Sequence, residues 1–288
     1  MHASKNVLTK VRIISLGEIV TPNFENTFKA FMYTIMQKDL ALKPHDIIPK
    51  LKQALAVLMQ EDEHGNSILN DFKVGKITEQ LFINKAIAAV KTNLGVELLG
   101  EEFKAAWRAG CPTYANFKDR LAAAIMFNAE PQQKMVLISF TNPIDMEHLR
   151  EELEKNALSF NIDPETGSLT KIGGMDLYLT YETKKSKAQL ITEVIQNLGA
   201  SKVEPTSATT FAEVSMVSTA TPEILYIKGV NQIEDLALAQ DFATTSAAVE
   251  SAADVCSVKT IIWEHSKQPL EDLLNSEAKV YHLEPAKL

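Results

Sequence analysis

Ser15 and Glu18 are the first side chains in the sequence whose type and position could support catalysis. Both follow residues 11–14 (VRII), an apolar run that predicts a buried strand opening into a loop. A serine hydroxyl becomes a nucleophile when a base accepts its proton, and no histidine lies near Ser15 in the sequence. Side chains alternate along an extended chain, so Glu18 should point away from the side chain at position 15. We expect Ser15 to be a small strand-end residue and Glu18 a solvated loop carboxylate; a base supplied to Ser15 from elsewhere in the fold is the alternative.

The histidines and cysteines form no recognisable metal or nucleophile motif. The six histidines are scattered without an HxxxH or HxH pair, and Cys111 and Cys256 form no CxxC pair. A zinc site and a disulfide framework are therefore disfavoured, and a reducing compartment fits. Gly173 and Gly174 precede a predicted strand, which is typical of a turn and not of a phosphate-binding loop.

Composition and charge exclude several classes of protein. The 288 residues include 29 basic and 37 acidic side chains, a net charge of −8, and no long Lys/Arg run, so general nucleic-acid binding is disfavoured. A 45% share of hydrophobic residues excludes wholesale disorder. No stretch approaches the roughly 18 apolar residues of a membrane span, and the first residues do not resemble a signal peptide. We expect a cytoplasmic globular protein with no nucleic-acid or membrane partner.

The apolar pattern predicts strands that alternate with helices, after a long helical segment. Strands are predicted at residues 11–14, 135–139, 176–181, 211–217, 224–227 and 258–263. Helices are predicted at residues 26–39, 44–59, 78–94, 100–108, 143–156, 187–198, 232–240 and 269–274. In the helix at 143–156, Asp145 and Glu147 lie in the first turns, where negative charge suits the helix dipole. This alternation predicts an α/β fold with a doubly wound parallel sheet, and residues 22–128 are a helical insertion after its first strand.

Five strings, in their order along the chain, resemble motifs of the haloacid dehalogenase (HAD) superfamily with a helical cap. Residues 15–20 (SLGEIV) are similar to the first motif in its DLGxVL form, and residues 137–142 (LISFTN) to the second motif, LxSNTN. Residues 74–82 (VGKITEQLF) resemble the cap segment GxITxxxF, and residues 94–107 resemble the next cap helix. Residues 179–182 (LTYE) resemble the LSYE string before the third-motif lysine.

The resemblance implies a HAD-like α/β core of residues 1–21 and 129–288 and a helical cap of residues 22–128. Enzymes of this family transfer phosphate through an aspartyl intermediate, with a second Asp two residues later as the acid and with Mg²⁺ held by further acids. In this chain Ser15 occupies the nucleophile position and Gly17 the acid position. The fourth motif falls either at Lys228 and Gly229 or at Thr244, and neither register supplies the acids. The resemblance therefore implies that the Mg²⁺ ligands are lost, and we expect no cofactor.

The residues that would bind phosphate in the family are better matched. Ser139, with Thr141 after it, matches the second-motif hydroxyl, and Lys185 best matches the third-motif lysine, with Lys184 and Lys187 close by. The resemblance makes Ser139, Thr141 and Lys185 candidates for binding an anion, and Lys228 adds positive charge where the metal would lie.

We therefore expect a catalytically inactive pseudophosphatase. It would bind a small anionic or phosphorylated ligand, or bind a protein partner through its cap. One alternative is a phosphate-ester hydrolase that uses Ser15 as its nucleophile. The other is a structural or interaction protein whose former pocket is packed shut.

Overall fold

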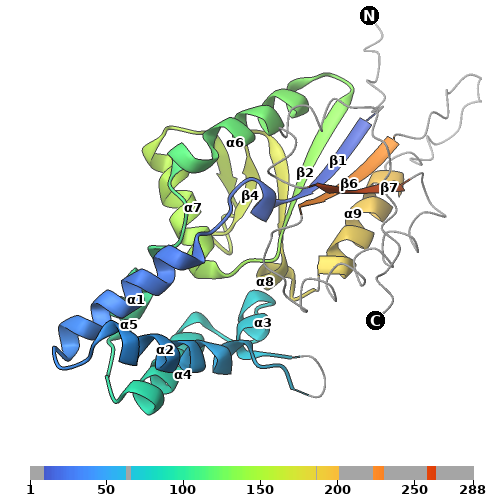
Figure 1. The fold of residues 1–288 in the computed structure, drawn as a ribbon. Coiled ribbons are helices and arrows are strands. Elements are labelled where there is room, and N and C mark those ends of the chain that lie inside the picture. Colours follow the sequence, from blue (N-terminus) through green and yellow to red (C-terminus); the bar gives the residue numbers. More distant parts are fainter. Residues whose placement is uncertain (1–9, 63–65, 186, 201–222, 230–257, 264–288) are drawn as a thin grey trace, which may run out of the picture.

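The central feature of the computed structural model is a seven-stranded sheet with the order β3-β4-β5-β2-β1-β6-β7 (Figure 1). The structure describes residues 10–62, 66–185, 187–200, 223–229 and 258–263. Five strands run parallel: β1 (Lys10–Ser15), β2 (Gln133–Ser139), β5 (Met175–Leu179), β6 (Glu223–Gly229) and β7 (Val258–Trp263). The predicted α/β class and all five of these strands are confirmed.

The sheet differs from the prediction at one edge. There, β3 (Phe160–Ile162) and β4 (Leu169–Ile172) run antiparallel beside β5, so the sheet is mixed. Both strands are short, and β3 is largely exposed, so neither carries the apolar run that marks a buried strand. Gly173 and Gly174, with φ of 54° and 80°, form the predicted turn between β4 and β5. The segments predicted at 211–217, 232–240 and 269–274 lie outside the described residues.

The insertion after β1 is helical, as predicted. Its helices α1 to α5, which we call the helical layer, are α1 (Phe24–Lys38), α2 (Pro44–Met59), α3 (Ile68–Lys73), α4 (Glu79–Leu94) and α5 (Gly100–Arg108). Asn23 and Thr78 cap α1 and α4 by accepting backbone N–H groups, which satisfies donors that a helix start leaves unpaired. The helical layer has its own apolar cluster, in which Phe31, Phe72 and Phe82 are fully buried.

The next helix, α6 (Tyr114–Ala129), packs on the sheet and not in the helical layer. Its buried residues Phe117, Leu121, Ala124 and Phe127 belong to the same apolar cluster as Leu137 of β2. The expected cap of residues 22–128 includes this helix, whose buried face packs against the sheet. Periodicity alone identifies the apolar face of a helix without saying which surface it covers.

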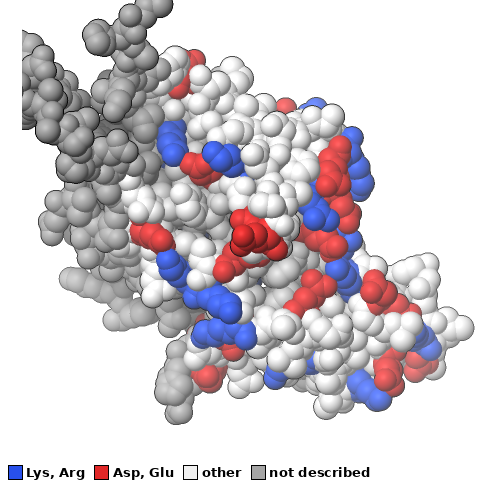
Figure 2. All heavy atoms as spheres, turned by 180° about the vertical axis from the view of Figure 1, so that it is seen from behind, with Lys and Arg blue, Asp and Glu red and all other residues white. Residues whose placement is uncertain are grey.

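Three further helices complete the described part of the chain. They are α7 (Pro143–Lys155), the short α8 (Thr180–Thr183) and α9 (Lys187–Ala200). Among the described residues, no helix is both long enough and apolar enough to cross a bilayer. From behind, acidic and basic side chains lie next to one another, most densely along one edge of the molecule (Figure 2).

Two chain segments join the helical layer to the sheet, and they run close together. The backbone N–H of Asn23 donates to the carbonyl of Gly110 at 2.6 Å, and the Thr27 hydroxyl donates to the carbonyl of Trp107 at 3.4 Å. A Cβ atom at position 110 would overlap with Thr27 Oγ1 and lie 2.8 Å from the carbonyl oxygen of Asn23. Only glycine therefore allows the two segments to approach this closely.

Replacing Gly110 by Ala should lower the free energy of unfolding by about 1–3 kcal/mol, because the new methyl group overpacks the junction. Urea denaturation followed by circular dichroism measures this loss. Gly100→Ala is the matched control, since a Cβ there meets Ile83 at an ordinary 3.8 Å. Equal stabilities of the two variants would contradict the prediction.

Candidate functional site

The carboxyl ends of β1, β2 and β6 bring the predicted site positions to one edge of the sheet. Ser15, the last residue of β1, pairs in register with Ile138, so Ser139 follows at the same edge. Ile14 pairs with Ile227, which places the backbone of Lys228 level with that of Ser15. In open α/β sheets, ligands bind outside the carboxyl ends of the strands. These carboxyl ends, at positions 15, 139 and 228, are therefore the candidate site. We call them the strand edge.

Ser15 and position 17 face one another at this edge. Ser15 is 8% exposed, and a Cβ built on Gly17 would lie 3.9 Å from its hydroxyl oxygen. That is the spatial relation that a nucleophile and an acid two residues apart require. Positions 15 and 17 are thus placed as a nucleophile and an acid would be. However, Ser15 offers only a hydroxyl group, and Gly17 has a hydrogen atom in place of a side chain.

Glu18 is buried, so the expectation of a solvated loop carboxylate was wrong. Only 4% of this residue is exposed. The alternation of an extended chain does not apply, because the chain turns directly after Ser15 into a short 3-10 helix, Leu16–Glu18. The buried carboxylate attracts the guanidinium group of Arg120 on α6. Burial lowers the pKa of Arg120, and attraction to the Glu18 carboxylate offsets part of that effect.

Arg120 fixes the turn that follows Ser15. Its Nη1 atom donates to the carbonyl of Glu18 at 3.2 Å and to the hydroxyl of Thr21 at 3.4 Å, and its Nη2 atom donates to the carbonyl of Asn116 at 3.3 Å. Thr21 in turn donates to the carbonyl of Gly17 at 2.8 Å. Arg120 was not predicted as a site residue, since an arginine on a helix gives no signal in the sequence of the distant turn that it contacts.

The second-motif residues divide between two roles. Ser139 is 3% exposed at the end of β2. The Thr141 hydroxyl donates to the Asp145 carboxylate of α7 at 3.1 Å, and the Asn142 side chain donates to the same oxygen at 2.7 Å. Thr141 was expected as an anion ligand, but its hydroxyl donates to the start of α7. Ser139 remains a candidate for binding an anion.

The buried lysine of the segment that matches the third motif is Lys187, not Lys185. Lys185 is 43% exposed in its side chain and pairs with Glu193 of α9 at 2.5 Å. Lys184 is exposed, with a left-handed φ of 55°. Lys187, the first residue of α9, is 6% exposed. The helix start turns Lys187 toward the interior, so it is a better candidate than Lys185 for the third-motif role.

The residues at the strand edge do not fit the Mg²⁺ ion that the family resemblance implies. Magnesium prefers carboxylate oxygens, and positions 15, 17 and 228 carry Ser, Gly and Lys. Within the described ranges, no group of three or more His, Cys, Asp or Glu side chains is placed to hold a metal. We therefore assign no chemical step to a metal.

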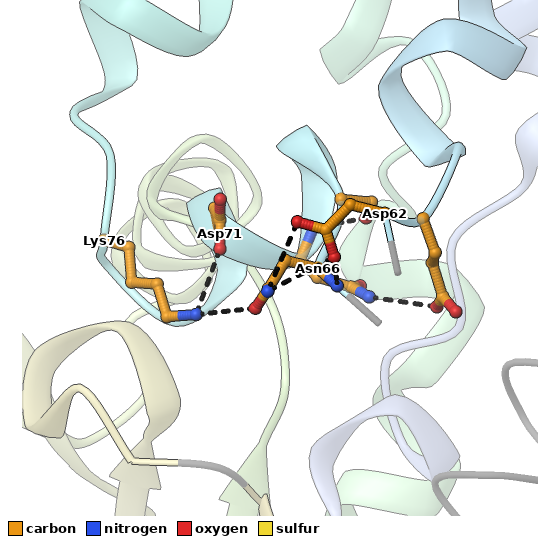
Figure 3. A network of polar contacts seen from close by, with 7 residues as sticks. Asp62, Asn66, Asp71 and Lys76 are labelled. Atoms are coloured by element: carbon orange, nitrogen blue, oxygen red, sulfur yellow. Dashed lines mark hydrogen bonds and ion pairs between the residues drawn. The ribbon is translucent and has the colours of Figure 1, made fainter. Parts of the chain in front are cut away.

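A second polar cluster lies in the helical layer, between α2 and α3 (Figure 3). The Lys76 ammonium pairs with Asp71 at 3.2 Å and donates to the Asn66 side chain at 2.9 Å, and Asn66 contacts Asp62. The Asp71 carboxylate thus contacts the Lys76 ammonium, and the Asp62 carboxylate contacts Asn66, within one short segment of the chain. The cluster stabilises the chain before and after α3, and its contacts point to no ligand.

The fold is an α/β sheet whose first strand is followed by a helical insertion, which is the arrangement that the resemblance to the HAD superfamily implied. No protein-family model and no curated protein matches the sequence. Several solved structures are similar. A HAD family enzyme from Bacteroides thetaiotaomicron, in a magnesium complex, shares 15% identity over 94% of this chain and 100% of its own, with a TM-score of 0.49. The same enzyme with magnesium and inorganic phosphate shares 16% identity over 90% of this chain and 100% of its own, with a TM-score of 0.46.

A predicted HAD-like family hydrolase from Porphyromonas gingivalis shares 14% identity over 94% of this chain and 100% of its own, with a TM-score of 0.46. These superpositions are loose. The strand order and the place of the insertion define the fold of this chain without them.

Replacing Arg120 by Met should lower the free energy of unfolding by about 1–3 kcal/mol, because three acceptors lose their donor and Glu18 loses its nearby cation. Chemical denaturation measures the change. The control is Arg150→Met, which removes only an exposed pair with Glu154 at 3.8 Å and should cost about 0.5 kcal/mol or less. A loss no greater than that of the control would show that Arg120 does not stabilise the turn.

Proposed function

We propose that this protein is a HAD-like binding or regulatory protein that does not hydrolyse phosphate esters through an aspartyl intermediate. The observation that carries this proposal is the pair of facing positions 15 and 17. The aspartyl route needs a carboxylate to attack phosphorus and a second one to protonate the leaving group. A hydroxyl and a hydrogen atom occupy those positions. The nearest carboxylate in sequence, Glu18, is buried and attracts Arg120.

The ligand class that best suits the strand edge is inorganic phosphate or a small phosphorylated molecule. Ser139 offers a hydroxyl group at the end of β2, and Lys187 offers a buried ammonium group at the start of α9. Charge-assisted hydrogen bonds from such groups are about twice as strong as neutral ones. Lys228 adds a third polar residue at the same edge. With Lys228 in place of an acid, this edge favours an anion without a metal.

Wild-type protein should not hydrolyse an aryl phosphate in the presence of Mg²⁺. The triple variant Ser15→Asp, Gly17→Asp, Lys228→Asp should hydrolyse it above the wild-type background, because the variant restores the carboxylates at positions that already face one another. Release of the phenol, followed by absorbance, measures both rates. Wild-type turnover that Ser15→Ala abolishes would overturn the proposal in favour of a serine nucleophile.

Inorganic phosphate should raise the midpoint of thermal unfolding of the wild-type protein, compared with chloride at equal ionic strength, since a ligand stabilises the state that binds it. Lys187→Met should abolish this increase, and Lys185→Met should preserve it. Each variant is compared with itself without phosphate, so a change in its basal stability does not affect the result. No increase in the wild type would favour a structural protein whose pocket is packed shut.

A further inference from the structure

The Asp145 carboxylate joins the helical layer to the sheet. Its Oδ1 atom accepts from Trp107 Nε1 of α5 at 2.9 Å and from Cys111 Sγ at 3.4 Å, both at the end of the insertion. Its Oδ2 atom accepts from Thr141 and Asn142, which follow β2. Burial raises the pKa of the Cys111 thiol, and the nearby carboxylate raises it further, so the thiol keeps its proton and donates it. We call these four donors and Asp145 the hinge contact.

Helix α7, which carries Asp145, packs in both parts of the molecule. Ile144 is fully buried in the apolar cluster of the helical layer, whereas Met146, Leu149 and Leu153 belong to the cluster under the sheet. One helix therefore contributes side chains to both apolar cores. Any rotation of the helical layer about its two connecting segments would withdraw Ile144 from its cluster and expose apolar surface.

Charged side chains continue this attachment along α5 and α7. Lys104 pairs with Glu147 at 2.6 Å, and Arg108 pairs with Glu151 at 2.6 Å. The two bases are four residues apart on one helix and the two acids four residues apart on the other, so both pairs form in the same register. Their side chains are 20% to 38% exposed, so solvent screens them only in part.

The opposite end of the helical layer is also attached. The hydroxyl of Thr180, at the end of β5, donates to the carbonyl of Lys73 at 2.7 Å. A Cβ at Gly75, which has a φ of 69°, would overlap with the carbonyl of Tyr181. The Lys73 ammonium lies 4.9 Å from the ring centre of Phe140, which follows β2. In Figure 1, α3 accordingly lies beside α8. We call these residues the tip contact.

From these two contacts we infer that the helical layer is fixed to the sheet as one rigid body and does not swing as a hinged cap. An opening motion would have to break the hinge contact, the paired charges of α5 and α7, or the tip contact. Breaking each contact would exchange its hydrogen bonds and ion pairs for contacts with water and would expose the apolar surface packed beside it. This inference concerns motion, and it stands whether or not phosphate binds at the strand edge.

Single-molecule energy transfer tests the inference in the full-length protein. Fluorophores are introduced through unnatural amino acids at Lys52 of α2 and Glu165 of the β3–β4 turn, both exposed, so that Cys111 stays in place. The wild type should give one population of transfer efficiency that phosphate and Mg²⁺ do not change. Two populations, or a shift on addition of phosphate, would overturn the inference.

Variants of the two contacts identify what holds the layer. Asp145→Asn should add a second population, and Glu154→Gln, on the same helix but paired only with Arg150, should not. Gly75→Ala should also add a second population of transfer efficiency, whereas Gly95→Ala should not. Gly95 has a similar φ of 72°, but a Cβ there meets no described atom within 4 Å. If Asp145→Asn does not fold, Trp107→Phe removes one hydrogen bond of the hinge contact alone. A single population in every folded variant would show that these contacts do not hold the layer.

Discussion

The Asp145 carboxylate is the interaction on which the arrangement of the molecule depends. A partly buried carboxylate is tolerated when hydrogen-bond donors surround it, and here donors from the insertion and from the loop after β2 meet at its two oxygens. Because these donors come from segments thirty or more residues apart, the carboxylate fixes how the helical layer lies relative to the sheet. The tip contact then follows, since α3 can reach α8 only from that orientation.

The same arrangement explains why polar residues near the strand edge have structural partners. Thr141 donates to Asp145, Lys185 pairs with Glu193, and Glu18 attracts Arg120. Residues that the motifs mark as candidates for chemistry thus act in part as positioning residues. Ser139 and Lys187 are the buried hydroxyl and ammonium groups on which the proposed anion site depends.

The sequence predicted the elements with a strong apolar pattern, which include all five parallel strands and most of the insertion. It did not predict β3 and β4, because short strands with exposed residues carry no such pattern. Nor did it assign α6 to the sheet, since an apolar face does not identify its partner. For the site, the motifs located the strand edge. They could not choose between Lys185 and Lys187, which depends on how the start of α9 is turned, or show that the chain turns at Glu18.

The absence of carboxylates at positions 15 and 17 is physically consistent with the burial of Ser15. Moving a carboxylate into a protein interior costs several kcal/mol even after relaxation, on the order of 2–5 kcal/mol when it lacks a partner. Two facing carboxylates at positions 15 and 17 would therefore require a cation or continued access to water. A hydroxyl group and a glycine have no such requirement, so Ser15 can be buried at this edge without a partner cation. A chain with aspartates at both positions would need a bound cation or access to water at this edge to keep both side chains ionised.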